Sequence, residues 1–254
     1  MNQMLRFRNV DVSNAGPFAS EQSLYFSEGL TLVAGGNGTG KTTIAKTLRR
    51  EYESTNRLTP EREIAEIPSW LIFFDDDVRT PYGGAPWAPL ALLMSSHREF
   101  FTRRSDFDSD LTMNVRKLLG TKLESRYSKF STRVTSPDQL HVTLNDDGAV
   151  VLTVNDGEHV IDCFQAMGER LALFLSINAA VRKLLFFDVP FVVDSQLGFL
   201  DQSLLRSCYQ FIPGVGKQTI VLESRLIVEM LGLRPHFQIV YDPRLERSTI
   251  EEIA

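Results

Sequence analysis

Cysteine is scarce in this chain of 254 residues, and it contains no long apolar run. Two cysteines, Cys163 and Cys208, are too few for a disulfide framework or a metal cluster, so we expect core thiols in a reducing compartment. No apolar stretch approaches the roughly 18 residues that a membrane helix needs. The first residues, MNQMLRFRNV, also lack the basic and apolar segments of a signal peptide. The sequence therefore predicts a cytoplasmic protein without a membrane partner.

An excess of positive charge is missing as well. The net charge is −5, which excludes a protein that coats nucleic acid through bulk positive charge. The four histidines show no metal-ligand spacing. One segment, 111–133, is nevertheless basic, with six cations against a single anion, Glu124. Two interpretations of this segment stay open, a solvated helix face and a surface that contacts a phosphate backbone.

The order of apolar runs indicates an α/β protein, because short buried-strand patterns alternate with amphipathic stretches. Strands are expected at 5–10, 23–26, 30–34, 190–193, 219–222 and 237–241. Helices are expected at 42–52, 90–104, 111–129, 164–185 and 201–211. Asp146-Asp147-Gly148 lies between two alternating runs, 140–144 and 150–154, and predicts a β-hairpin. We expect a short acidic tail at the end of the chain.

The strongest motif is a glycine-rich loop between a predicted strand and a predicted helix. It reads Gly35-Gly36-Asn37-Gly38-Thr39-Gly40-Lys41-Thr42 and fits the pattern G-x-x-x-x-G-K-[ST] of phosphate-binding loops. Glycines let successive backbone N–H groups converge on a phosphate, and the helix start adds positive potential. In such a loop Lys41 bridges the β- and γ-phosphates, and the Thr42 hydroxyl binds Mg²⁺. The motif predicts a nucleoside triphosphate site, which we extend to Thr43.

A second carboxylate is needed to complete the magnesium site, at the end of a neighbouring buried strand. The apolar run 190–193 ends in Asp194, which we expect to fill this role. An aspartate after a strand can also simply cap a turn, and that alternative stays open. The triplet 75–77 consists of three aspartates, but successive residues point apart, so a second metal site there is disfavoured.

Three features of the chain resemble ABC-type ATPase heads of the SMC/RecF branch. They are the opening RFRNV…GPF…F…GLTLVAGGNGTGKTT, the helical segment 163–181, and the string DSQLGFLD at 194–201. QAMGER, at 165–170, lies where such proteins have LSGGE or LSAGER, and Leu200-Asp201 matches their D-loop. The string DSQLGFLD is also similar to the DTPLGRLD of DndD-type ATPases, which act in DNA phosphorothioation and phage defence.

The resemblance implies an α/β P-loop NTPase of the ABC-ATPase head type, with a mixed β lobe, a helical insertion and a parallel core sheet. It makes 1–254 a single head, with an N-lobe at 1–75, a helical insertion in place of a coiled coil at 76–138, and a C-lobe at 139–254. It also implies an ATP-dependent homodimer or heterodimer, in which Gly168 and Glu169 face the partner's nucleotide and Asp201 lies at the seam.

Further partners follow from the same resemblance. It places the basic helix where related heads meet DNA, so we expect double-stranded DNA to contact Arg116, Lys117, Lys122, Arg126 and Lys129. It also implies other subunits of a DNA repair or phage-defence complex. ATP rather than GTP is expected from the resemblance, and the sequence contains no guanine-reading N-K-x-D motif.

Four positions depart from the family pattern. Ala166 replaces the signature serine, Ser195 the glutamate after the magnesium aspartate, and Ser224 the switch histidine, beside Glu223. The fourth departure is a missing Q-loop, because no glutamine occurs between residues 22 and 139. Loss of a general base typically costs about 10²–10⁴-fold in rate, so we expect ATP binding with slow or no hydrolysis.

Two functions stay open on these grounds. One is a slowly hydrolysing ATPase, in which Gln196, Glu223 or a partner orients the water. The other is a nucleotide-gated regulatory clamp whose separate partner performs the chemistry. The candidate catalytic positions are Lys41, Asp194, Ser195 and Gln196. A small-molecule kinase leaves the MGER and LGFLD matches unexplained, and an ABC transporter subunit lacks support because LSGGQ is not evident.

Overall fold

The computed structural model describes residues 6–19, 21–57, 67, 69–74, 100, 102–130, 140–145, 150–154, 159–160 and 166–253. The chain divides into two compact units. Unit 1 comprises Met1–Val78, Asp188–Gly198 and Gly216–Ala254, and unit 2 comprises Arg79–Phe187 and Phe199–Val215. The lobe boundaries drawn from the sequence stay a prediction.

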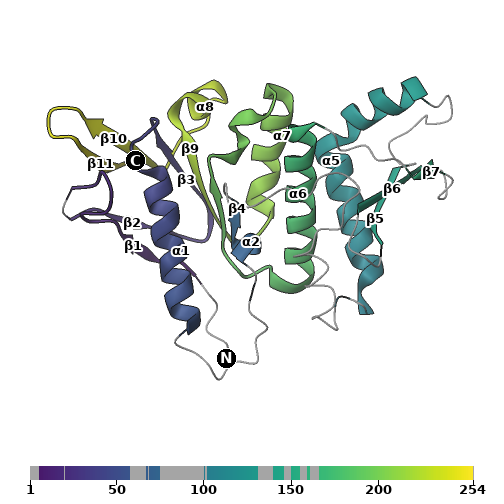
Figure 1. Ribbon diagram of the computed structural model, residues 1–254, viewed down its shortest axis with the longest axis horizontal. Coiled ribbons are helices and arrows are strands. Elements are labelled where there is room, and N and C mark those ends of the chain that lie inside the picture. The colour runs from purple at the N-terminus through teal and green to yellow at the C-terminus, as the bar shows by residue number, and fades with distance from the viewer. Residues whose placement is uncertain are drawn as a thin grey trace. The chain divides into compact units, whose positions relative to one another are not determined.

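In the described part of the chain, unit 1 is built on a six-stranded sheet with the strand order β11-β10-β3-β9-β8-β4. Its strands are β3 (Gly29–Gly35), β4 (Phe73–Phe74), β8 (Phe191–Asp194), β9 (Gln218–Ser224), β10 (Phe237–Asp242) and β11 (Arg247–Glu252). Neighbouring strands are parallel except β10 and β11 (Figure 1). β8 and most of β3 and β9 are buried, which is why the sequence shows them as continuous apolar runs.

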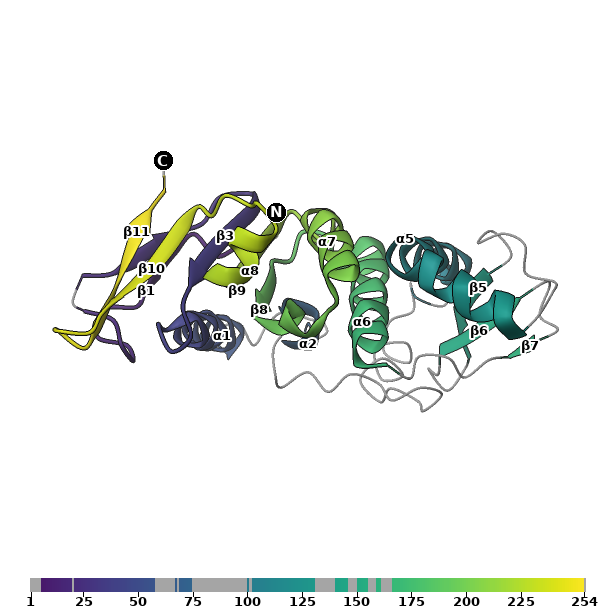
Figure 2. The ribbon, with the colours of Figure 1, turned by 90° about the horizontal axis from the view of Figure 1, so that it is seen from above.

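Helix α1 (Lys41–Arg57) covers one face of this sheet, as Figure 2 shows. Its buried side chains, Ile44, Ala45, Leu48 and Tyr52, recur at helical spacing and form the stripe that packs on β8 and β9. Unit 1 also contains an antiparallel pair, β1 (Asn9–Asp11) with β2 (Ser23–Tyr25), and two short helices, α2 (Ser69–Ile72) and α8 (Arg225–Met230).

The end of the chain differs from the expected acidic tail, because β11 continues the sheet there. Ser248 is buried and pairs with Phe18, and the backbone N–H of Ile250 donates to Oε1 of Gln22 at 2.8 Å. The exposed pair Glu251 and Glu252 gives this segment its acidic composition. The alternation of inward and outward residues, rather than the charge, determines that it is a strand.

Unit 2 contains the helices α5 (Arg104–Phe130), α6 (Met167–Val181) and α7 (Gln202–Phe211). Nearly every residue of α6 is buried, as expected of a core helix. It continues into a π-helical turn, Arg182–Phe186. The sequence predicts one uninterrupted helix through this segment. The Arg182 guanidinium is buried and donates to the Val215 carbonyl at 3.1 Å, and burial lowers its pKa to about 9.

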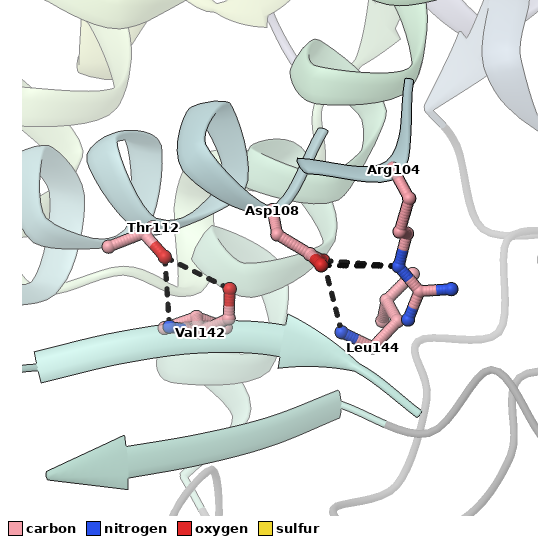
Figure 3. A network of polar contacts seen from close by, with 5 residues as sticks. All are labelled: Arg104, Asp108, Thr112, Val142 and Leu144. Carbon is pink, nitrogen blue, oxygen red and sulfur yellow. Dashed lines mark hydrogen bonds and ion pairs between the residues drawn. The ribbon is translucent and has the colours of Figure 1, made fainter. Parts of the chain in front are cut away.

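A small antiparallel sheet packs on α5 in the same unit. Its strands are β5 (Leu140–Leu144), β6 (Val150–Val154) and β7 (His159–Val160), so the predicted hairpin is confirmed. Figure 3 shows how it is attached: Thr112 Oγ1 accepts from the Val142 N–H at 2.9 Å and donates to the Val142 carbonyl at 3.0 Å. Asp108 accepts from the Leu144 N–H at 3.4 Å and pairs with Arg104.

The other predicted helices are found with shifted ends. α1 is longer than predicted, and α5 begins at Arg104 rather than at 111. α7 begins directly after Asp201, whose carboxylate caps it by accepting from the Leu204 N–H at 3.1 Å. Most of the predicted helix at 90–104 lies outside the described residues, as do the three aspartates at 75–77.

Candidate functional site

The glycine-rich loop follows β3 and ends where α1 begins, at Lys41. Gly38 and Gly40 have φ values of +77° and +110°, which side-chain-bearing residues rarely adopt. The Thr39 hydroxyl donates to the Gly36 carbonyl at 2.9 Å and closes the loop on itself. The loop therefore has the strand–loop–helix geometry of a phosphate-binding loop, as the sequence predicts.

A second segment of unit 1, Gly16–Phe18, packs closely against this loop. A Cβ atom on Gly40 would lie 2.7 Å from the Phe18 ring and 2.9 Å from Pro17. A Cβ atom on Gly16 would lie 2.8 Å from Oγ1 of Thr43. The segment Gly16–Phe18 thus packs against the loop and the first turn of α1. The sequence contained one signal for this contact, the string GPF, but its place against the loop depends on tertiary packing.

Lys41 is the basic group at the centre of the site. It is only 7% exposed, and its Nζ atom donates to the carbonyls of Gly35 at 3.0 Å and Gly36 at 2.7 Å. Burial lowers the pKa of this ammonium, and the negative charges of Glu223 and then Asp194 oppose that shift. The ammonium therefore lies within electrostatic reach of two carboxylates.

Asp194 ends β8, where its backbone pairs with Leu222 of β9. The next residue, Ser195, has a φ value of +53°, an unusual conformation for a residue with a side chain. Its N–H donates to the Leu222 carbonyl at 2.8 Å, and its hydroxyl donates to the same carbonyl at 3.2 Å. The N–H and the hydroxyl of Ser195 are thereby both bound to β9. The backbone of Gln196 lies in a 3₁₀ turn, Gln196–Phe199, and its side chain is outside the description.

Glu223 and Ser224 end β9, which pairs with β3, the strand that leads into the glycine-rich loop. Glu223 is 1% exposed, and one of its carboxylate oxygens accepts from the Ser224 N–H at 2.6 Å. The Ser224 hydroxyl accepts from the Ile227 N–H at 3.3 Å and caps α8. Sequence reasoning proposed Glu223 only as a group that orients water. That it acts on Lys41 was missed, although an acid at the end of an apolar strand is the same signal that identified Asp194.

Thr42 and Asp194 bring hydroxyl and carboxylate oxygens to this edge of the sheet, and such oxygens suit Mg²⁺. The chain's own residues therefore fit the metal that accompanies a triphosphate. Among the residues that the structure describes, no group of three His, Cys, Asp or Glu side chains could hold a metal ion.

The predicted signature residues lie in unit 2, at the start of α6. Ala166 occupies the N-cap position, and its side chain gives the helix no capping hydrogen bond. Met167 is 57% exposed, whereas Glu169 is buried. A Cβ atom on Gly168 would lie 3.2 Å from a methyl group of Leu200, so a larger residue would crowd the D-loop string. Gln165 lies outside the described residues.

Residues 111–130 of the basic segment lie in α5, and its last cation, Arg133, lies outside the described residues. Lys117 is exposed, and its ammonium lies 5.4 Å from the centre of the Phe211 ring, whereas Arg116 is half-buried. Lys122, Arg126 and Lys129 follow in the same helix, and their side chains are outside the description. Cys208 is a buried free thiol, as predicted, and Cys163 is not described. Of the described helices, none is long and apolar enough to span a membrane.

Comparisons with known proteins bear on this arrangement. A family described as AAA domain matches residues 9–49, the segment from β1 through the glycine-rich loop into α1. None of the curated proteins matches the chain. Among solved structures, the chain is similar to an SMC head bound to the C-winged helix domain of ScpA, with 14% identity and a TM-score of 0.63. That match covers 94% of this chain and 95% of the other.

Two further SMC heads are similar along nearly their whole length. The head domain from Thermotoga maritima has 12% identity and a TM-score of 0.52, covering 98% of this chain and 100% of that one. A head with an extended coiled coil, bound to the C-terminal domain of ScpA and derived from Pyrococcus furiosus, has 12% identity and a TM-score of 0.52, covering 94% of each chain.

The fold and the site together define a P-loop ATPase fold, mixed α/β with a mostly parallel core sheet. More narrowly, it is the fold of SMC heads, so the predicted fold class is confirmed.

Proposed function

We propose that this chain is an ATP-binding head that dimerises on ATP and couples closure to DNA binding, with slow hydrolysis. The observation that carries the proposal is the buried Lys41 ammonium at the glycine-rich loop, within reach of the Asp194 carboxylate. Backbone N–H groups of 35–40 would bind phosphate oxygens, and Lys41 would move from its loop carbonyls to the β- and γ-phosphates. Thr42 and Asp194 would hold Mg²⁺, which neutralises charge on these phosphates.

Dimerisation rests on the start of α6. Its first N–H groups lack a side-chain cap from Ala166, and Met167 beside them is exposed. Helix N-termini attract anions, so this end would bind the γ-phosphate on the partner head, with Gly168 and Glu169 nearest and Asp201 at the seam. Two of the three similar SMC heads are bound to domains of ScpA, which supports further subunits here. We place this assembly in DNA repair or phage defence, as the DndD-like string suggests.

A second candidate is a regulatory clamp that binds ATP without hydrolysing it. The bonds of Ser195 to the Leu222 carbonyl favour it, because the position after Asp194 then offers no base to an attacking water. The Ser224 hydroxyl is likewise engaged in capping α8. Under this hypothesis, ATP closes the dimer and a separate partner protein performs the chemistry.

The test measures Mg·ATP binding by calorimetry, dimer formation by analytical ultracentrifugation, and ATP hydrolysis with and without duplex DNA. Lys41→Ala is the background and should abolish binding and dimerisation. Turnover above that background, raised by DNA and lost in Asp194→Asn, supports the ATPase. Binding and dimerisation without turnover support the clamp. Equal binding by the parent chain and Lys41→Ala would contradict both.

DNA contact is tested separately on α5. The triple change of Lys122, Arg126 and Lys129 to glutamate should weaken duplex binding and flatten its salt dependence, because each phosphate contact releases counterions. The matched control changes three cations outside α5, Arg234, Arg244 and Arg247, in unit 1. An equal loss in the control would show that only net charge matters.

A further inference from the structure

Three buried charged groups meet at the edge of the unit 1 sheet where its parallel strands end. Lys41 and Asp194 are each 7% exposed and Glu223 is 1% exposed. Glu223 comes from β9, whose residues 223 and 224 pair with Ala34 and Gly35 of β3. Lys41 Nζ in turn lies 3.0 Å from the Gly35 carbonyl. The carboxylate of Glu223 therefore belongs to the strand directly beside the one that carries the loop.

Glu223 is held in place by the backbone. Its carboxylate accepts from the N–H of Ser224 at 2.6 Å, and Ser224 in turn caps α8. Among the groups acting on the Lys41 ammonium, Glu223 is the largest electrostatic one and exceeds Asp194. The Glu223 carboxylate thus lies within electrostatic reach of the lysine that should receive phosphate.

The balance of charge among these three groups is one ammonium against two carboxylates. Without a metal ion, the net negative charge of these three groups opposes the binding of a triphosphate, which is itself strongly negative. In a partly buried site, where the effective dielectric constant is about 20, one unit charge within contact range changes the affinity for a charged ligand by about tenfold or more. A divalent cation held by Asp194 reverses the sign of the balance.

We propose that Glu223 is a positioning residue that makes nucleotide capture depend on a divalent metal. Its charge holds the Lys41 ammonium against the carbonyls of Gly35 and Gly36 and opposes metal-free ATP, whereas Mg²⁺ offsets this charge when it enters with the nucleotide. The inference rests on the proposed function in one respect, that the loop binds ATP. It is independent of hydrolysis, dimerisation and DNA.

The experiment uses Glu223→Gln in the full chain. Glutamine keeps an oxygen that can accept from the Ser224 N–H but removes the charge. Calorimetry gives Kd for ATP in excess EDTA and for Mg·ATP, in the parent and the variant. We expect the metal-free affinity to rise at least tenfold and the Mg·ATP affinity to change less than about threefold. The ratio of the two Kd values should therefore fall at least tenfold.

Two further variants complete the design. Glu229→Gln removes one negative charge from α8, where Glu229 is exposed and pairs with Arg225, and it should leave the ratio unchanged. Glu223→Met conserves side-chain volume and serves as a second neutral replacement if the glutamine variant does not fold. Thermal melting shows which variants are folded.

The outcomes separate cleanly. A ratio that stays within threefold of the parent in a folded neutral variant overturns the inference, as does a parallel loss of both affinities, which marks Glu223 as merely structural. An equal fall of the ratio in Glu229→Gln assigns the effect to overall charge and also overturns it. If the parent binds neither form of ATP, the proposed function itself fails.

Discussion

The contact between Phe18 and Gly40 yields a prediction whose size follows from the structure. In Gly40→Ala, the new methyl group would lie 2.7 Å from two carbons of the Phe18 ring, well inside the usual contact distance. Overpacking of this kind costs about 1–3 kcal/mol. The φ value of +110° adds a backbone cost of about 1–3 kcal/mol.

Only the first of these costs depends on the ring. Phe18→Leu shortens the side chain and should remove the contact with the ring, while the 2.9 Å contact with Pro17 and the backbone strain stay. The two changes should therefore couple, with Gly40→Ala costing at least about 1 kcal/mol less in the leucine background than in the parent. Gly38→Ala is the matched control, because Gly38 has a φ value of +77° but no neighbouring atom within 4 Å of its added Cβ.

Urea denaturation of the four proteins of the cycle measures the coupling, and Mg·ATP affinity provides a second readout on the folded proteins. Gly38→Ala should cost only the backbone strain, about 1–2 kcal/mol, in either background. The reasoning fails if Gly40→Ala is equally costly with and without the Phe18 ring, or if Gly38→Ala shows the same coupling.

The remaining predictions concern stability. Gln218→Leu deletes two hydrogen bonds to the Phe7 backbone and one to the Ser27 carbonyl, so the free energy of unfolding should fall by about 2–4 kcal/mol, whereas Gln210→Leu, at an exposed position, should change it little. Ser195→Ala should cost about 1 kcal/mol for its lost hydrogen bond. Ser195→Gly should be near neutral, because relief of the positive φ returns about 1 kcal/mol. Burial raises the pKa of Asp108, so its protonated form stabilises the fold at acid pH and that stabilisation is lost as the pH rises through the raised pKa. Melting temperatures from about pH 3 to about pH 7 should therefore fall more in the parent than in Asp108→Asn.

The features that short stretches of sequence determine could be predicted before the structure was known. The glycine-rich loop, the antiparallel pairing of β5 with β6 and the carboxylate at the end of β8 all follow from short strings. No short string predicts the hydrogen bonds of Ser195 to the Leu222 carbonyl. The same is true of the electrostatic effect of Glu223 on Lys41. Both depend on β9 lying between β3 and β8, an order that joins residues about 30 to 190 positions apart. No motif in either strand specifies its neighbour.

The strand order also explains why the two unusual serines have structural partners. β9 supplies the carbonyl that binds Ser195 and the hydroxyl that caps α8 at Ser224. A longer acid at 195 would lose the hydroxyl's hydrogen bond to that carbonyl while keeping a positive φ, and a histidine at 224 would remove the cap. Because both positions are engaged by the backbone, restoring one family residue alone should not restore hydrolysis. Any turnover must then come from Gln196, Glu223 or a partner, and the neutral Glu223 variants distinguish these sources because they remove only one of them.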